Sequence, residues 1–238
     1  LCAPSPEDMI ATIRSRCRHL GLRIPTAAAV ADLLVREGVA TPEVALEAAR
    51  AAQSHIGLAR ALARDPQMRE RRRAIITAPA SVRSVGEAVM AADRLLETAK
   101  AQADAQVSER NAREKAELMR QLGMDEGESA TKASRTMIRQ LEEDQKRRSK
   151  RALTDAIDRA LIDLLAIYRD VLMVQVGGDG ELINTDLADL VHEIAQDSTP
   201  RQTLARVDRI ETARKRLVSN GNPLLVLEDM AISLRPQA

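Results

Sequence analysis

Hydrophobic residues recur every three or four positions over the C-terminal half of the chain, the period of a helix with one buried face. The clearest run predicts a long helix over 135–176, ended by GGDG at 177–180. Its inward face follows Leu153, Ile157, Leu161, Leu164, Tyr168, Val171 and Gln175. Three further helices are marked by Leu187, Leu190, Val191 and Ile194, by Leu204, Val207, Ile210 and Leu217, and by Leu224, Leu225, Leu227 and Met230. These segments predict a helical bundle.

The middle of the chain is more polar. Residues 66–77 and 80–122 predict two helices separated at Pro79, because proline cannot donate the helical hydrogen bond. The second helix loses its apolar stripe over 100–117, as an exposed or partner-facing helix would. The segment GMDEGESATKAS at 123–134 is typical of a mobile loop.

Three short helices are expected nearer the N-terminus, over 27–37, 42–52 and 55–63. Thr26 is expected to cap the first, and Gly38 to end it. Tight turns between short helices favour a compact helical subdomain.

Several helix starts combine a capping side chain with proline at the first helical position. This signal occurs at Ser5, Thr41, Asp65, Thr199 and Asn222. Gln202, three residues after Thr199, completes a capping box. Before residue 25 the pattern is less regular: 1–4 resemble the end of a buried strand, 6–16 a helix and 18–24 a short extended piece.

Composition supports the same fold class. The chain has 238 residues, no Phe or Trp, and Tyr168 as its one aromatic residue. Ala and Leu, which favour helices, are abundant, whereas β-sandwiches and barrels rely on aromatic and β-branched residues. The lack of aromatics also excludes single-strand binders that stack bases on aromatic rings. We therefore expect an all-α protein.

Charge and cysteine usage exclude further classes. The net charge of +1 gives no overall attraction to nucleic acid. Arg greatly outnumbers Lys, which with the high Ala content indicates a GC-rich genome. Cys2 and Cys17 fit neither a zinc motif nor a disulfide framework. No apolar run reaches 18 residues, and no signal peptide is evident. Because the chain begins with Leu, we expect it to start inside a larger protein.

The segment Ser15-Arg16-Cys17 follows a predicted strand end and a capped helix. By chemistry alone, Arg16 is a surface arginine near a helix C-terminus, where a cation suits the helix dipole. The wider stretch, LCAPSPEDMIATIRSRCRHLGL at 1–22, resembles the segment of clamp-loader AAA+ ATPases that runs from the sensor-1 strand into a Ser-Arg-Cys motif. The resemblance implies that Arg16 is an arginine finger, with Ser15 and Cys17 completing the motif.

Two later segments resemble the same family. QSHIGLA at 53–59 is similar to the lid segment carrying sensor 2, but Ile56 stands where hydrolysing subunits have Arg. The same residues also predict a helix N-terminus capped by Ser54. NGNPLLVLE at 220–228 is similar to the last collar helix of loader subunits, and is equally a well-capped core helix. Together these segments resemble the non-hydrolysing delta-prime subunits, of the actinobacterial type.

The resemblance implies an architecture: the end of an AAA+ core at 1–24, an AAA+ lid at 25–65, and a helical collar for oligomerisation at 66–238. It implies a non-hydrolysing subunit of a loader that places a sliding clamp on primed DNA for a DNA-directed DNA polymerase. Arg16 would complete the ATP and Mg site of a neighbouring subunit, and this chain would carry no cofactor, metal site or active site of its own. The implied partners are tau/gamma and delta subunits, the clamp and primer-template DNA, in the cytoplasm and without a membrane.

Two basic runs stand outside these motifs, RERRR at 69–73 and KRRSKR at 146–151. Each lies in a predicted helix among acidic residues. A solvated helix face is the simpler interpretation of both, and contact with DNA phosphates is the alternative.

Other functions remain open. Within the family, the alternative is an ATP-hydrolysing tau/gamma subunit, which the absence of Arg at Ile56 disfavours. Outside it, a helical scaffold or coiled-coil adaptor would require a sustained heptad, and the pattern is broader and broken by Gly and Pro. A DNA-binding regulator would require a recognition helix on a basic domain.

Overall fold

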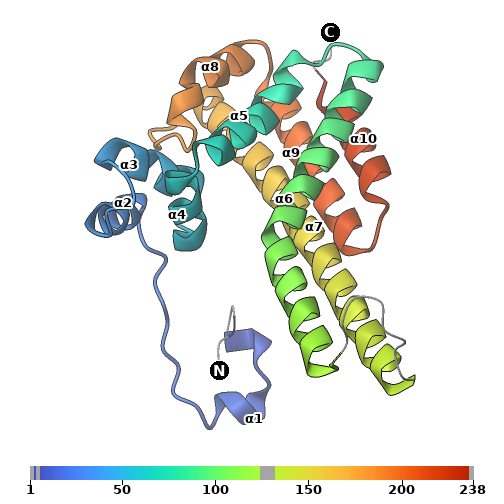
Figure 1. The fold of residues 1–238 in the computed structure, drawn as a ribbon. Coiled ribbons are helices and arrows are strands. Elements are labelled where there is room, and N and C mark those ends of the chain that lie inside the picture. Colours follow the sequence, from blue (N-terminus) through green and yellow to red (C-terminus); the bar gives the residue numbers. More distant parts are fainter. Residues whose placement is uncertain (1–2, 4–5, 124–131, 236–238) are drawn as a thin grey trace.

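The computed structural model describes residue 3, residues 6–123 and residues 132–235. The described residues are almost entirely helical and contain no strand, so the all-α prediction is confirmed (Figure 1). The elements are η1 (Pro6–Asp8), α1 (Ala11–Arg14), α2 (Ala27–Arg36), α3 (Pro42–Ala51), α4 (Ile56–Arg64), α5 (Pro66–Ser81), α6 (Val85–Gln121), α7 (Lys132–Gln175), η2 (Thr185–Leu187), α8 (Ala188–Gln196), α9 (Pro200–Val218) and α10 (Pro223–Leu234).

Helices α2, α3 and α4 pack around a small core of their own. Leu34 and Leu62 are buried at its centre, and most of the remaining core side chains are alanines of α3 and α4. Alanine lets helix backbones approach closely, at the cost of little apolar area per residue. These helices occupy the ranges that the sequence predicted, within one residue at each end.

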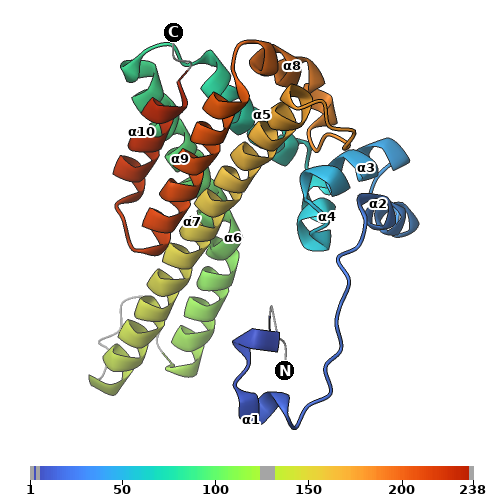
Figure 2. The same ribbon diagram turned by 180° about the vertical axis from the view of Figure 1, so that it is seen from behind.

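A larger core lies in the C-terminal bundle, where α7 packs against α5, α6, α8 and α9 (Figures 1 and 2). Leu161 and Val171 of α7 are fully buried, as are Ile210 of α9 and Leu227 of α10. Burying an aliphatic side chain of this size stabilises the fold by about 1.5–3 kcal/mol. The core therefore joins helices from both ends of the bundle sequence.

Tyr168 of α7 is buried in this core, and the Arg206 guanidinium lies 5.8 Å from its ring centre. Burial raises the pKa of Tyr168 to about 12, with Arg206 acting in the opposite direction. The ring is thus a core side chain and unavailable for stacking.

Most predicted helix caps are confirmed. The side chains of Thr26, Asp65 and Asn222 accept hydrogen bonds from backbone N–H groups of the first turn that follows each. Thr199 and Gln202 form the expected capping box. Thr41 precedes α3 but accepts no capping hydrogen bond.

The two glycine stops are also confirmed. Gly38 and Gly177 both have φ of +66°, a region open to glycine but strained for other residues. They follow the ends of α2 and α7, where this conformation turns the chain out of the helix.

The predicted break at Pro79 is wrong. Helix α5 continues through Pro79 to Ser81, and the chain turns only at Val82. Proline removes one donor, but the strong signal lies just beyond it: the Ser84 side chain accepts from Glu87 N at 3.1 Å, and Glu87 Oε2 accepts from Ser84 N at 3.2 Å. This capping box fixes the start of α6 at Val85.

Two apolar residues face solvent where the sequence predicts a core position. Leu204 is 49% exposed and Leu225 is 63% exposed. On α9 the buried side chains instead follow Thr203, Ile210 and Ala213, one position out of step with Leu204.

Helices α6 and α7 continue past the rest of the bundle as an antiparallel pair (Figures 1 and 2). We call residues 103–121 and 132–152 the α6–α7 arm. Ala103, Val107 and Ala152 are buried within it. The predicted polar stretch 100–117 is therefore partner-facing within the chain itself.

The arm also corrects the expectation about heptads. Its inward positions on α7 alternate spacings of three and four residues, as in a coiled coil. They are 134, 138, 141, 145, 148 and 152. The apolar pattern hid this repeat because two of the six positions are the polar Gln145 and Arg148.

The N-terminal segment differs from the prediction. The expected helix over 6–16 is reduced to η1 and the four-residue α1, with a bend between them. Neither element buries a side chain in the described part of the chain, so little packing stabilises a longer helix. Residues 18–24 have no regular structure, as expected of an extended piece. The strand end at 1–4 and the Ser5 cap lie outside the described residues, Ala3 apart, and most of 123–134 does too.

Candidate functional site

Ser15, Arg16 and Cys17 lie together in an exposed turn directly after α1. Ser15 Oγ donates to the Thr12 carbonyl at 3.2 Å, and Arg16 N donates to the Ile13 carbonyl at 3.1 Å. The Cys17 thiol is free and exposed. The Arg16 side chain has no hydrogen bond or ion pair to any residue that the structure describes. Its guanidinium is thus open to a ligand or another chain.

Ile56 opens α4 and is 38% exposed. The predicted cap Ser54 is wrong: the N-cap is His55, whose Nδ1 accepts from Leu58 N at 3.1 Å. Gln53 and Ser54 both have positive φ, which aims the chain into this cap. A side chain at the next position would crowd the ring, since a Cβ on Gly57 would lie 3.3 Å from His55 Cε1.

Helix α5 joins the α2–α4 cluster to the bundle and carries the basic run 69–73. Arg69 Nη1 donates to the carbonyls of Leu62 at 2.6 Å and Ala63 at 3.2 Å. These carbonyls belong to the last turn of α4, where backbone acceptors lack partners within the helix. Arg69 therefore fastens the end of α4 to α5.

Arg72 is the buried member of this run, with 10% of its side chain exposed. Its Nε donates to Asp163 Oδ1 on α7 at 3.0 Å, and its Nη2 donates to Asn184 Oδ1 at 2.6 Å. Asp163 and Asn184 are buried. Burial raises the pKa of Asp163, and the Arg72 charge opposes that rise.

Asp170 lies one helical face further along α7 and is fully buried. Its carboxylate accepts from Ile183 N at 3.0 Å, from Asn184 N at 2.8 Å and from Asn184 Nδ2 at 2.9 Å. These bonds fold the segment after α7 back onto the helix. The same Asn184 amide then presents its oxygen to Arg72.

The segment after α7 also reaches the N-terminal cluster. Arg50 of α3 donates to Glu181 Oε2 at 2.9 Å, and Arg169 donates to the Glu181 carbonyl at 2.8 Å. On α5, Arg73 pairs with Asp186 at 3.4 Å. We call the buried and half-buried members of this set the arginine junction: Arg50, Arg69, Arg72, Asp163, Asp170 and Asn184.

The junction holds the α2–α4 cluster against the bundle. Its charges are paired or hydrogen-bonded, and no nucleophile lies among its six residues, so its chemistry is positional. The run 69–73 is accordingly not a simple solvated face, since Arg69 and Arg72 point into the protein.

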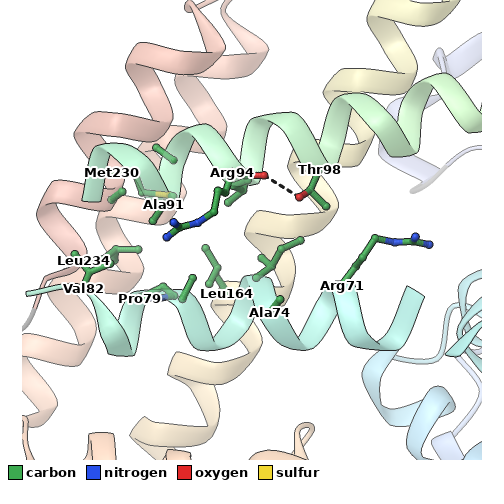
Figure 3. A pocket seen from close by; sticks show the side chains of 15 residues that line it. Arg71, Ala74, Pro79, Val82, Ala91, Arg94, Thr98, Leu164, Met230 and Leu234 are labelled. Atoms are coloured by element: carbon green, nitrogen blue, oxygen red, sulfur yellow. Dashed lines mark hydrogen bonds between the residues drawn. The ribbon is translucent and has the colours of Figure 1, made fainter. Parts of the chain in front are cut away.

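An apolar pocket of about 190 Å³ opens between α5 and α6 (Figure 3). Leu164, Met230 and Leu234 contribute to its lining, and the Arg94 side chain extends into the space between the two helices in this view. A cavity of about 150 Å³ accepts a benzene ring, so this pocket can hold one apolar side chain or a small ring. Its lining includes no carboxylate, histidine or cysteine for acid–base or nucleophilic chemistry.

Among the described residues, no group of three or more His, Cys, Asp or Glu side chains could hold a metal ion. Over the same part of the chain, no helix is both long and apolar enough to cross a membrane.

Comparison with known proteins places the C-terminal half. The family model "DNA polymerase III, delta subunit, C terminal" matches residues 129–235. The chain is also 36% identical over 72 residues to DNA polymerase III subunit delta′ of Bacillus subtilis (strain 168). That match covers 30% of this chain and 22% of the relative, so the chain corresponds to a minor part of that protein's length. No solved structure matches.

Residues 129–235 thus form a helical domain of the DNA polymerase III delta C-terminal class. Within that class the domain is of the delta-prime type. It begins at the arm and includes most of α7 with α8, α9 and α10, which are the helices that build the larger core.

Sequence reasoning found the Ser-Arg-Cys turn but missed the arginine junction. The arginines were visible as a charge run, whereas their partners Asp163 and Asn184 lie 91 and 112 residues further along the chain. No local pattern marks such pairs.

Proposed function

We propose that this chain acts as the C-terminal part of a non-hydrolysing delta-prime subunit in the DNA polymerase III clamp loader. The observation that carries the proposal is the delta-prime-type domain at 129–235. In this proposal residues 66–238 form the collar, 25–65 the lid and 1–24 the end of an AAA+ core. The partners are tau/gamma and delta subunits, the sliding clamp and primer-template DNA, in the cytoplasm.

Arg16 is proposed to act as an arginine finger at the ATP site of a neighbouring tau/gamma subunit. Two features support this role: its side chain is exposed, and it has no partner among the described residues. A planar guanidinium can donate two hydrogen bonds to γ-phosphoryl oxygens as charge spreads over them, which a lysine cannot do in the same geometry. ATP and Mg would belong to the neighbour, with none held by this chain.

Ile56 supports the non-hydrolysing assignment over the tau/gamma alternative. An apolar side chain at the start of α4 cannot neutralise phosphate charge. The arginine junction gives this architecture a physical basis, because it fixes the proposed lid on the proposed collar.

The test is ATP hydrolysis by a reconstituted loader containing the full-length subunit with Arg16→Ala. An arginine finger contributes on the order of 10³–10⁵ in rate at its site, so clamp- and DNA-stimulated hydrolysis at that site should be lost. Arg14→Ala, two residues earlier on α1, is the matched control and should keep full activity. An Arg16→Ala loader that assembles and hydrolyses ATP like the wild type would refute the finger.

A further inference from the structure

The second basic run lies on α7 within the α6–α7 arm, and its residues divide between two faces. Arg148 points inward: its guanidinium donates to Glu114 Oε2 at 2.8 Å and to Asn111 Oδ1 at 2.7 Å. Lys146, Arg147, Lys150 and Arg151 are exposed on the opposite side. We call these four side chains the basic face of the arm.

The basic face has little compensating charge. Arg147 is 3.8 Å from Glu143, which Arg139 also approaches at 3.3 Å. Lys150 donates to the neutral Asn220 side chain at 3.2 Å. Lys146 and Arg151 have no ion pair within the described residues.

Within the helix these four charges repel one another. Residues three and four apart are neighbours on a helix surface, so Lys150 lies beside both Lys146 and Arg147, and Arg151 lies beside Arg147. Each like-charge neighbour destabilises a helix by about 0.2–0.5 kcal/mol. A binding partner that supplies negative charge would remove this repulsion.

A shallow groove between α6 and α7 runs along this face. Lys100, Lys146, Arg147 and Lys150 contribute to its lining, and its acidic members are Asp104 and Glu143. Cations therefore outnumber carboxylates along the groove by four to two. This local excess of positive charge exists although the whole chain is nearly neutral.

The kind of anion follows from what the face lacks. Single-strand binders stack bases on aromatic rings, and the one aromatic ring of this chain, Tyr168, is buried. The face offers only Lys and Arg side chains in a row, which suits repeated phosphates without base recognition. We propose that the basic face of the arm contacts the phosphate backbone of a nucleic-acid duplex, independently of its sequence.

This contact would lie on the arm, apart from Arg16, and it does not depend on the proposed loader function. It predicts a weak, salt-sensitive affinity. Four phosphate contacts give a slope of about −3.6 for log K against log[salt], so affinity should fall about 10²-fold between 50 and 200 mM salt.

The experiment is fluorescence anisotropy of a labelled mixed-sequence DNA duplex, titrated with the 238-residue chain across this salt range. The variant Lys146→Gln/Lys150→Gln/Arg151→Gln should bind more weakly and reduce the slope by about one per residue removed. Glutamine keeps good helix propensity, and circular dichroism verifies that the variant is folded. The control Arg113→Gln/Lys115→Gln/Arg120→Gln removes the same charge from exposed positions of α6 and should leave binding unchanged.

Several results would overturn the proposal. One is the absence of duplex binding at 50 mM salt, and another is an equal loss in both triple variants, which would indicate a general charge effect. Tighter binding to a single strand of the same length would contradict the duplex assignment. Binding to vesicles of anionic phosphatidylserine in place of the duplex would make the face a membrane contact.

Discussion

The two basic runs of this chain look alike in sequence and differ in three dimensions. In RERRR at 69–73, Arg69 and Arg72 reach backbone carbonyls and a buried carboxylate on other helices. In KRRSKR at 146–151, only Arg148 points into the protein, and the rest remain outside. A run of charge therefore has no fixed meaning: its role depends on whether the fold brings acceptors within reach.

The difference also separates the kinds of energy involved. A buried charge is costly unless it is paired, so each partner in the arginine junction depends on the other. An exposed charge is screened by water and salt, so its removal changes stability little. Substitutions in the two runs should therefore have very different consequences.

The largest expected effect is that of Arg72→Met. It would leave Asp163 buried without its cation and Asn184 Oδ1 without a donor, and should lower the free energy of unfolding by about 3–5 kcal/mol. The loss should shrink at acidic pH, because burial already raises the pKa of Asp163 and protonation would remove its charge. Chemical denaturation measures both.

Arg71→Met is the matched control for Arg72→Met. Arg71 pairs with Asp65 at 3.2 Å on an exposed surface, so its loss should cost less than about 1 kcal/mol. Equal effects of the two variants would mean that the junction does not distinguish buried from exposed arginines.

A smaller effect concerns the inward arginine of the second run. Hydrogen bonds from Arg148 and then from Arg110 lower the pKa of Glu114 to about 2, from an ordinary value of 4.5. A carboxyl with a lowered pKa stabilises the folded state above its unfolded pKa, and this contribution is lost as pH falls toward 2. The difference in Tm between wild type and Glu114→Gln should therefore be present at about pH 6 and should vanish near pH 2.

Glu109→Gln provides the comparison for Glu114→Gln. Glu109 is an exposed residue of α6 with no ion pair in the described chain. Thermal melts followed by circular dichroism should show a Tm difference for Glu109→Gln that is small and independent of pH. A similar acid dependence in both variants would show that the Arg148–Glu114 contact does not stabilise the arm.

The smallest effect is expected from the basic face. Lys146→Gln/Lys150→Gln/Arg151→Gln removes neighbouring like charges, so its free energy of unfolding should stay within about 0.5 kcal/mol of wild type or rise slightly. A loss above about 1 kcal/mol in denaturant titrations would mean that these side chains have structural partners, as Arg72 does.

Local signals predicted the helices well. The periodicity of α7, the glycine stop at Gly177 and the capping box at Thr199 depend on residues close in sequence. The capping box at Ser84 and Glu87 was equally local, and attention to Pro79 obscured it. The heptad of the arm was hidden because polar residues occupy inward positions.

The arginine junction could not be predicted in the same way. Whether Arg72 is buried depends on where α7 places Asp163, and that position is set by packing of the whole bundle. The Ser-Arg-Cys turn shows the opposite case: its motif was recognised by resemblance, while its geometry within this chain is only an exposed turn.

The account's central claim is that this chain assembles as a delta-prime-type subunit through its C-terminal bundle. Native mass spectrometry of the chain mixed with delta and tau/gamma collar domains tests it most directly. The account predicts a mixed assembly that contains one copy of this chain. A homo-oligomer, or a monomer that ignores both partners, would contradict it.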